Sequence, residues 1–137
     1  MLTEADIDRI GKAVEARVLP KAEWTHAAHF AAAMWVLTHP RLEAERDMPG
    51  MIRAYNEATG NSNTDSSGYH ETITQASIRA ARAFLHAHSP RAEALNQLLT
   101  SRLGRSDWLL AHFSRERLFS VEARRGWVEP DLSPLAF

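Results

Sequence analysis

Two segments of the chain carry side chains that bind divalent metals or move protons, Glu23–His29 and Gly68–Thr72. The first holds His26 and His29, which are one helical turn apart and so can share a metal or a substrate. The second holds His70 and Glu71. Imidazole nitrogens and carboxylate oxygens suit zinc, nickel or ferrous iron. We therefore expect His26, His29, His70 and Glu71 to form a metal site, with Glu71 also acting catalytically as proton acceptor for a metal-bound water.

Each of these residues also has a structural interpretation. The helical pattern after Tyr69 places His70 on the buried face, where burial and the positive end of the helix dipole both favour a neutral imidazole. Such a ring can bind a metal, or it can be a core histidine hydrogen-bonded to Thr74 or to a backbone carbonyl. Glu71 in a first turn is favourable for the dipole alone. Adjacent helical residues diverge by about 100°, so His70 and Glu71 would not ordinarily converge.

Aromatic and hydroxyl side chains near the histidines predict a ligand pocket, formed by Tyr69, Thr74, Tyr55 and Trp24. In a helix that starts at Lys21, Trp24 lies on a stripe roughly opposite the two histidines. Tyr55 closes the preceding helical segment and is expected to line the same space.

The elements that must position these residues all read as helices. No stretch alternates apolar and polar residues as a strand would. Thr3 is a cap for a first helix that ends at Leu19-Pro20. The later expected helices run from Lys21 to Thr38, from Pro49 to Gly60, from Gly68 to His88, and from Ser89-Pro90 to Gly104, with further starts at Ser106-Asp107 and Ser114 and a stop at Gly126. We predict one all-α domain over residues 1–137, an irregular bundle of five or six helices with an extended tail from Trp127 to Phe137.

Composition excludes several classes of function. The chain has 16 basic and 17 acidic residues, a net charge of −1, and no basic block of the kind that binds nucleic acid. It has no cysteine, so thiolate metal sites and disulfides are excluded. The longest apolar run, Ala31 to Leu37, is far shorter than the roughly 20 residues that span a bilayer. We expect a cytoplasmic protein without nucleic-acid or membrane partners, and the sequence leaves its oligomeric state open.

Several motifs together resemble a group of small, uncharacterised bacterial helical proteins. They are Trp24-Thr25-His26-x-x-His29, the stretch from Ile52 to Asn56, Asn63-Thr64, the stretch from Gly68 to Thr74, and the later Ser114-x-x-x-Leu118 and Pro130-Asp131-Leu132. The resemblance covers most of the chain. It implies no activity and no cofactor, because none is established for that group.

Two functions compete on this basis. The first is a metal-binding protein or metal-dependent enzyme that uses the histidine cluster with zinc, nickel or iron. The second is a non-catalytic protein that binds a small molecule or serves in assembly, in which the histidines are buried hydrogen-bonding groups beside an aromatic pocket.

Overall fold

The computed structural model describes all 137 residues and consists of helices and loops alone. The all-α class is confirmed, with seven α-helices where five or six were expected. In chain order the elements are α1 (Glu4–Glu15), η1 (Lys21–Glu23), α2 (His26–Leu37), α3 (Ala44–Ala58), α4 (Glu71–Ala87), α5 (Arg91–Thr100), η2 (Arg102–Gly104), η3 (Trp108–Ala111), α6 (Arg115–Leu118) and α7 (Val121–Arg125), where η marks a 3-10 helix.

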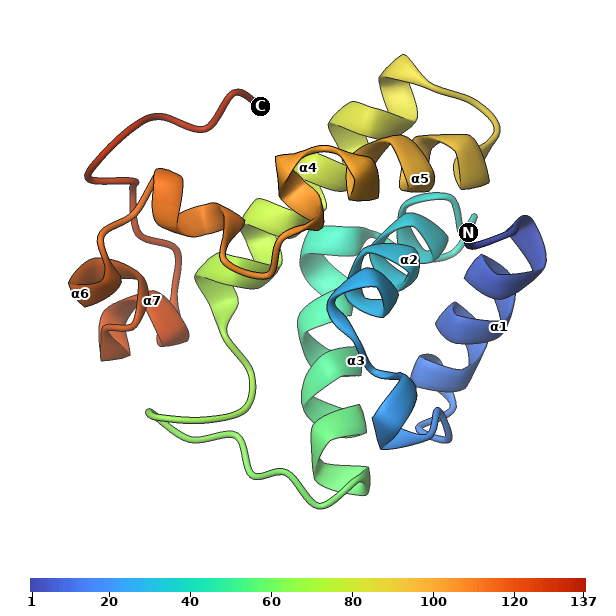
Figure 1. Cartoon of the computed structure of the whole chain (residues 1–137). Helices are drawn as coiled ribbons and strands as arrows, with labels where there is room; N and C mark the ends of the chain where they lie inside the picture. The colour runs from blue at the N-terminus through green and yellow to red at the C-terminus, as the bar shows by residue number, and fades with distance from the viewer.

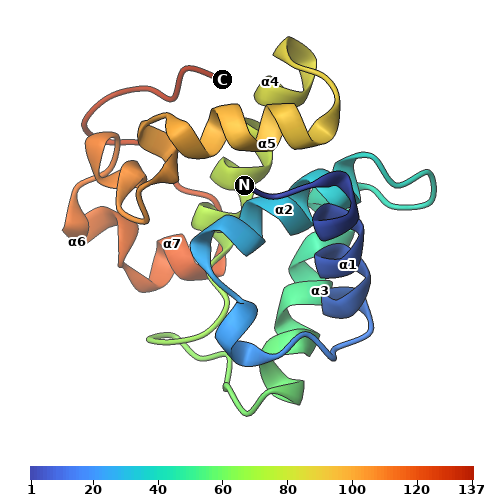
Figure 2. The same cartoon turned by 45° about the vertical axis from the view of Figure 1, so that its right-hand side comes forward.

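The centre of the bundle is α2, which contacts α1, α3, α4 and α5 (Figure 1 and Figure 2). Seven consecutive residues of this helix, Phe30 to Val36, are buried, so it has no solvent-facing side. On one side α1 approaches so closely that a Cβ on Gly11 would lie 2.1 Å from the Trp35 ring. Only glycine permits this contact, which fixes the first two helices against each other.

The start of α2 differs from the expectation, and this difference reshapes the site. Residues Lys21–Glu23 form the separate η1, and Thr25 caps α2 by accepting a hydrogen bond from the Ala28 backbone N–H at 3.2 Å. Threonine is a favoured N-cap residue, and the cap places Trp24 outside the helix. The prediction of one helix from Lys21 was therefore wrong.

The third helix begins five residues earlier than predicted, at Ala44, and carries Pro49 inside it. A proline has no N–H, so the Glu45 carbonyl one turn earlier loses its usual helical partner. The Gln75 side chain of α4 donates to that carbonyl oxygen at 3.4 Å. A neighbouring helix thus compensates for the proline, which explains why the helix does not start there.

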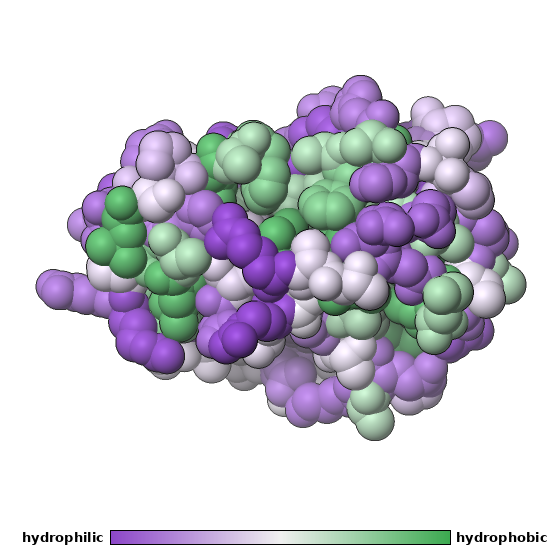
Figure 3. All heavy atoms as spheres, turned by 45° about the horizontal axis from the view of Figure 1, so that its top comes forward, coloured by the Kyte–Doolittle hydropathy of each residue, from purple (hydrophilic) through white to green (hydrophobic).

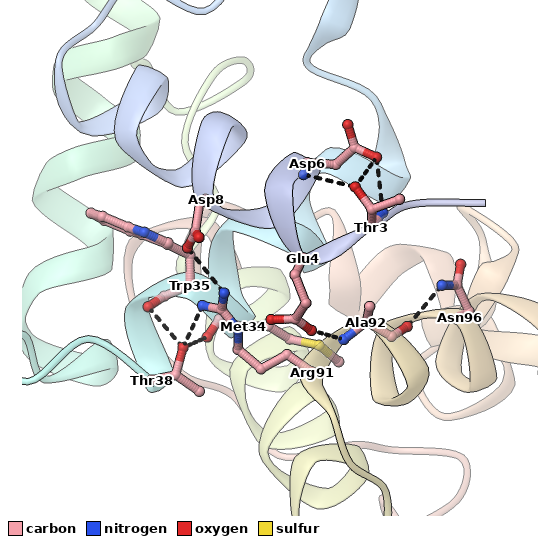
Figure 4. A network of polar contacts seen from close by, with 10 residues as sticks. All are labelled: Thr3, Glu4, Asp6, Asp8, Met34, Trp35, Thr38, Arg91, Ala92 and Asn96. Atoms are coloured by element: carbon pink, nitrogen blue, oxygen red, sulfur yellow. Dashed lines mark hydrogen bonds and ion pairs between the residues drawn. The ribbon is translucent and has the colours of Figure 1, made fainter.

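The first helix and α5 are joined by a polar network (Figure 4). Arg91 at the start of α5 donates to Glu4 at 2.8 Å and to Asp8 at 3.0 Å, both on α1, and to the Thr38 hydroxyl at 3.1 Å. Glu4 also accepts from the Ala92 backbone N–H, one of the free amides at the start of α5. The network closes the bundle by joining its first helix to α5.

The chain after α5 is a series of short helices, of which η2 packs against α5 and α7 packs against α4 (Figure 1). Serine caps start three of these helices, Ser101 before η2, Ser114 before α6 and Ser120 before α7. The cap at Ser120 divides the segment from Ser114 to Gly126 into α6 and α7, and the helix expected to start at Ser106-Asp107 is the 3-10 helix η3.

The tail after α7 contains no helix and is held to the body by polar contacts. Asp131 accepts from the Ser114 backbone N–H at 2.8 Å, and the Leu132 N–H donates to the His112 carbonyl at 2.9 Å. On the face that Figure 3 shows, hydrophilic side chains separate the hydrophobic patches from one another. None of the helices combines the length and the apolar character needed to cross a lipid bilayer.

Candidate functional site

His70 is the N-cap of α4 and uses both of its ring nitrogens within the protein. Its Nδ1 accepts from the Ile73 backbone N–H at 3.1 Å, so its Nε2 carries the proton and donates to the Leu118 carbonyl at 2.6 Å. The residue is 7% exposed, and burial, followed by the nearby positive charge of Arg124, lowers its pKa. His70 therefore joins the start of α4 to the end of α6, as in the structural alternative of a core histidine bonded to a backbone carbonyl.

Glu71, the first residue of α4, is directed to a different set of partners. Its carboxylate accepts from the Tyr69 hydroxyl through Oε1 and from the Gln75 side chain at 3.1 Å through Oε2. The Tyr69 hydroxyl is buried and bonded to this carboxylate, and both effects raise its pKa. Glu71 lines neither of the cavities described below. The structure thus separates Glu71 from the histidines it was predicted to join.

His26 and His29, by contrast, lie together at the start of α2. His26 Nε2 donates to the Leu103 carbonyl at 2.8 Å, and His29 Nδ1 donates to the Thr25 carbonyl at 2.8 Å. Each backbone oxygen fixes the ring tautomer, so His26 Nδ1 and His29 Nε2 keep a lone pair without a protein partner. Both residues line the same cavity. A fixed tautomer with one free acceptor nitrogen is the form that binds a ligand donor or accepts a proton.

The ring of His29 is held in place by Trp24. The two rings are stacked with their centroids 3.7 Å apart, and Trp24 in turn meets the edge of Tyr55 at 5.3 Å. The expectation that Trp24 lies opposite the histidines was therefore wrong, because it assumed a helix that includes residue 24. Burial is the main cause that lowers the pKa of His29, and the neighbouring His26 acts in the same direction. His29 is thus a neutral base at neutral pH.

The two histidines open onto a cavity of about 410 Å³ that we call the apolar cavity. Nine of its 16 lining residues are hydrophobic. They come from α2, α3, α4, the segment 106–110 and the end of α6, and include Phe30, Met48, Ile52, Ile73, Trp108 and Phe119. Its volume lies within the range of about 300–1,000 Å³ typical of small-molecule sites.

A second space of about 630 Å³, the polar cavity, lies between Trp24, the end of α3 and the loop 59–70. It shares His29, Ile52, Ile73 and Thr74 with the apolar cavity, so His29 stands where the two meet. Of the predicted pocket residues, Thr74 lines both cavities, and Trp24 and Tyr69 line the polar one. Tyr55 lines neither: it is fully buried behind Trp24, with its hydroxyl donating to the Leu19 carbonyl at 2.9 Å.

The four predicted metal ligands do not converge. No group of three or more histidine, aspartate or glutamate side chains is arranged to hold a metal ion. Two imidazoles reach the apolar cavity, while His70 is engaged at both nitrogens and Glu71 lies with Tyr69 and Gln75. Metal binding itself stays a prediction.

Sequence reasoning missed most of the apolar wall. Trp108 and Arg115 line the cavity, although neither is among the residues that the sequence predicts for a site. Ser77 is the exception, because its helical position relative to His70 already places it on the buried face of α4. The segment 106–110 is short and irregular, so no periodicity could indicate which of its side chains face α2.

The chain matches no protein-family model, and neither the curated proteins nor the solved structures contain a match to it. The resemblance to small bacterial helical proteins therefore stays a prediction, and the function has to be argued from the site itself.

Proposed function

We propose that this protein binds a small, largely apolar molecule in the apolar cavity, with His29 Nε2 accepting a hydrogen bond from it. The observation that supports this proposal is a cavity of about 410 Å³ with mostly hydrophobic walls, lined by His29, whose Nε2 has no protein partner. Small-molecule sites combine these properties: apolar area supplies affinity, and a few fixed polar atoms set orientation.

The geometry at His29 favours recognition of a hydrogen-bond donor. Its Nδ1–H is committed to the Thr25 carbonyl, and its ring is held by the stack on Trp24. The lowered pKa keeps Nε2 unprotonated near neutral pH, so this atom accepts and does not donate. A molecule with a hydroxyl or N–H on an apolar body would complement this wall.

Binding of n-hexanol and n-octanol, measured by ligand-observed NMR and by calorimetry, tests the proposal. In Ser77→Phe, a phenyl ring on α4 would fill part of the apolar cavity, and we expect at least tenfold weaker binding, about 1.4 kcal/mol. Ser66→Phe makes the same change on an exposed loop residue that lines neither cavity, and should bind as the wild type does. Equal binding by the two variants, or no binding to the wild type, would overturn the proposal.

Metal binding is the second candidate, favoured by one observation. His26 Nδ1 and His29 Nε2 are both without a protein partner, and both residues line the same cavity. Two imidazoles could hold zinc, nickel or ferrous iron together with ligand or water oxygens. Elemental analysis of protein purified without a histidine tag distinguishes the candidates. Stoichiometric metal that is lost in His26→Gln would support this one, and a melting temperature unmoved by added metal would count against it.

A further inference from the structure

We propose that the polar cavity is the subsite for an uncharged, hydroxyl-bearing head group of the same ligand. This inference rests on the proposed function, because the apolar part of that ligand would occupy the apolar cavity. The ligand would then be amphipathic, with an apolar tail, a neutral polar head, and the junction of the two beside His29.

The two cavities adjoin each other. They share His29, Ile52, Ile73 and Thr74, contributed by α2, α3 and α4. A ligand anchored against Phe30 and Trp108 in the apolar cavity would therefore extend past the His29 ring into the polar cavity. His29 Nε2 would accept from the first hydroxyl of the head group.

The lining of the polar cavity indicates a neutral occupant. Besides His29, its polar members carry amide, hydroxyl and imidazole groups, and none is an aspartate, glutamate, lysine or arginine: Asn56, Asn61, Ser62, Ser67, Tyr69, His70 and Thr74. A charged head group would give up hydration there without a direct ion pair to a lining side chain, because the nearby Lys21 and Arg53 are engaged with Asn61 and with the Tyr69 ring. Hydroxyl groups both donate and accept, so they can pair with the amide and hydroxyl side chains of this set, whereas both ring nitrogens of His70 are already engaged.

Asn56 supplies the most specific observation. The residue is 7% exposed, and its Nδ2 donates to Asn63 Oδ1 at 3.0 Å, whereas its Oδ1 has no protein partner. The only fully buried side-chain atom without a partner is Arg124 Nε, so Asn56 Oδ1 is open to the cavity that Asn56 lines. An acceptor that is open to a cavity binds water, and a ligand hydroxyl could take the place of that water.

The loop that forms the outer wall is held in shape before any ligand arrives. Asn63 Nδ2 donates to the Arg53 carbonyl at 3.1 Å, and Asn63 Oδ1 also accepts from the Tyr69 N–H at 3.0 Å. Arg124 of α7 donates to the Gly68 carbonyl at 3.1 Å and holds the other end. A wall ordered in advance reduces the entropy lost on binding.

Calorimetry with three probes that share one tail tests the inference: n-hexyl β-glucoside, n-hexanol and n-hexyl phosphate. We expect the glucoside to bind at least tenfold tighter than hexanol, and the phosphate to bind no tighter than hexanol. Ser62→Trp places an indole on an exposed residue that lines the polar cavity. It should remove the advantage of the glucoside and leave hexanol binding unchanged, whereas Ser66→Trp in the same loop should change neither.

Asn56→Ala, checked for folding by circular dichroism, should weaken glucoside binding and spare hexanol; if it does not fold, the Ser62→Trp result decides. Equal affinity for glucoside and hexanol, tightest binding of the phosphate, or an unaltered glucoside advantage in Ser62→Trp would each overturn this inference. Those results leave the proposed function standing as long as hexanol binds. Failure of all three probes to bind would overturn both.

Discussion

His70 makes two separable contributions to stability, and substitutions at this position can measure each. In His70→Ala the cap of α4 is lost, which costs about 1 kcal/mol, because the Ile73 N–H loses its acceptor. The Leu118 carbonyl also loses its donor in a buried place, which costs a further 1–3 kcal/mol or so. We expect the free energy of unfolding to fall by about 2–4 kcal/mol. At about 4 °C per kcal/mol for a chain of this size, the melting temperature should fall by about 8–16 °C.

His70→Asn separates the two contributions, because asparagine is itself a good N-cap but cannot reach Leu118 as the imidazole does. It should be about 1 kcal/mol more stable than His70→Ala. His86→Ala changes an exposed histidine of the same helix and should have a melting temperature near that of the wild type. Urea denaturation followed by circular dichroism gives all three values. If both variants at residue 70 stay within about 0.5 kcal/mol of the wild type, or if alanine and asparagine are equivalent, His70 does not cap α4 and the structural interpretation is refuted.

Three further predictions concern charge, backbone and ion pairing. Burial lowers the folded-state pKa of His70 below the ordinary 6.5, so the unfolded chain binds more protons than the folded chain as pH falls through 6.5, and the free energy of unfolding falls. The pKa of His29 is lowered too, but this residue is present in both proteins and its effect cancels. The difference in unfolding free energy between wild type and His70→Asn should therefore narrow from pH 7 to pH 5.5 in denaturation curves, and a constant difference would contradict this. Gly68→Ala should destabilise the protein by more than about 1 kcal/mol, because φ at residue 68 is +80° and the new Cβ would lie 2.5 Å from the Ser62 carbonyl oxygen. Gly50 of α3 has open space around it, so Gly50→Ala should leave the melting temperature unchanged or raise it. Arg91→Ala should lower the free energy of unfolding by about 1–2 kcal/mol, because the contacts with Glu4 and Asp8 are lost. Arg105→Ala, which removes an exposed ion pair with Asp107, should lower it little or not at all. Equal losses in the two variants would show that the network in Figure 4 contributes no more than a surface ion pair.

The helical class and most helix positions could be predicted from local signals. Thr3 is predicted as a cap and Ser114 as a helix start, and in the structure both are N-caps that accept from the Asp6 and Arg117 amides. The predictions that were wrong concern features that depend on residues far away in the sequence. Pro49 lies inside α3 because Gln75 of α4 takes the freed carbonyl, and no pattern within 44–58 contains that information.

The candidate site, too, could be predicted only where local sequence determines it. The sequence predicted that His26, His29 and His70 meet in one site, which the structure does not show, and it offered a backbone-bonded His70 as an alternative. It could not show that the partner of His70 is the Leu118 carbonyl, 48 residues away, or that Leu103 faces His26. One local signal could have been used better: Thr25 is a stronger N-cap than Pro20, and starting α2 after Thr25 frees Trp24 to stack on His29.

The imidazole nitrogens of His29 provide the most direct test of ligand binding beside α2. Nitrogen-15 NMR of the histidine side chains, recorded during a titration with n-hexanol, reports the tautomer and the hydrogen bonding of each ring. We predict that His29 is protonated on Nδ1, and that hexanol shifts its Nε2 resonance while those of His86 and His112, which line neither cavity, stay in place. A His29 ring protonated on Nε2, or an Nε2 resonance that saturating hexanol leaves unmoved, would contradict the account.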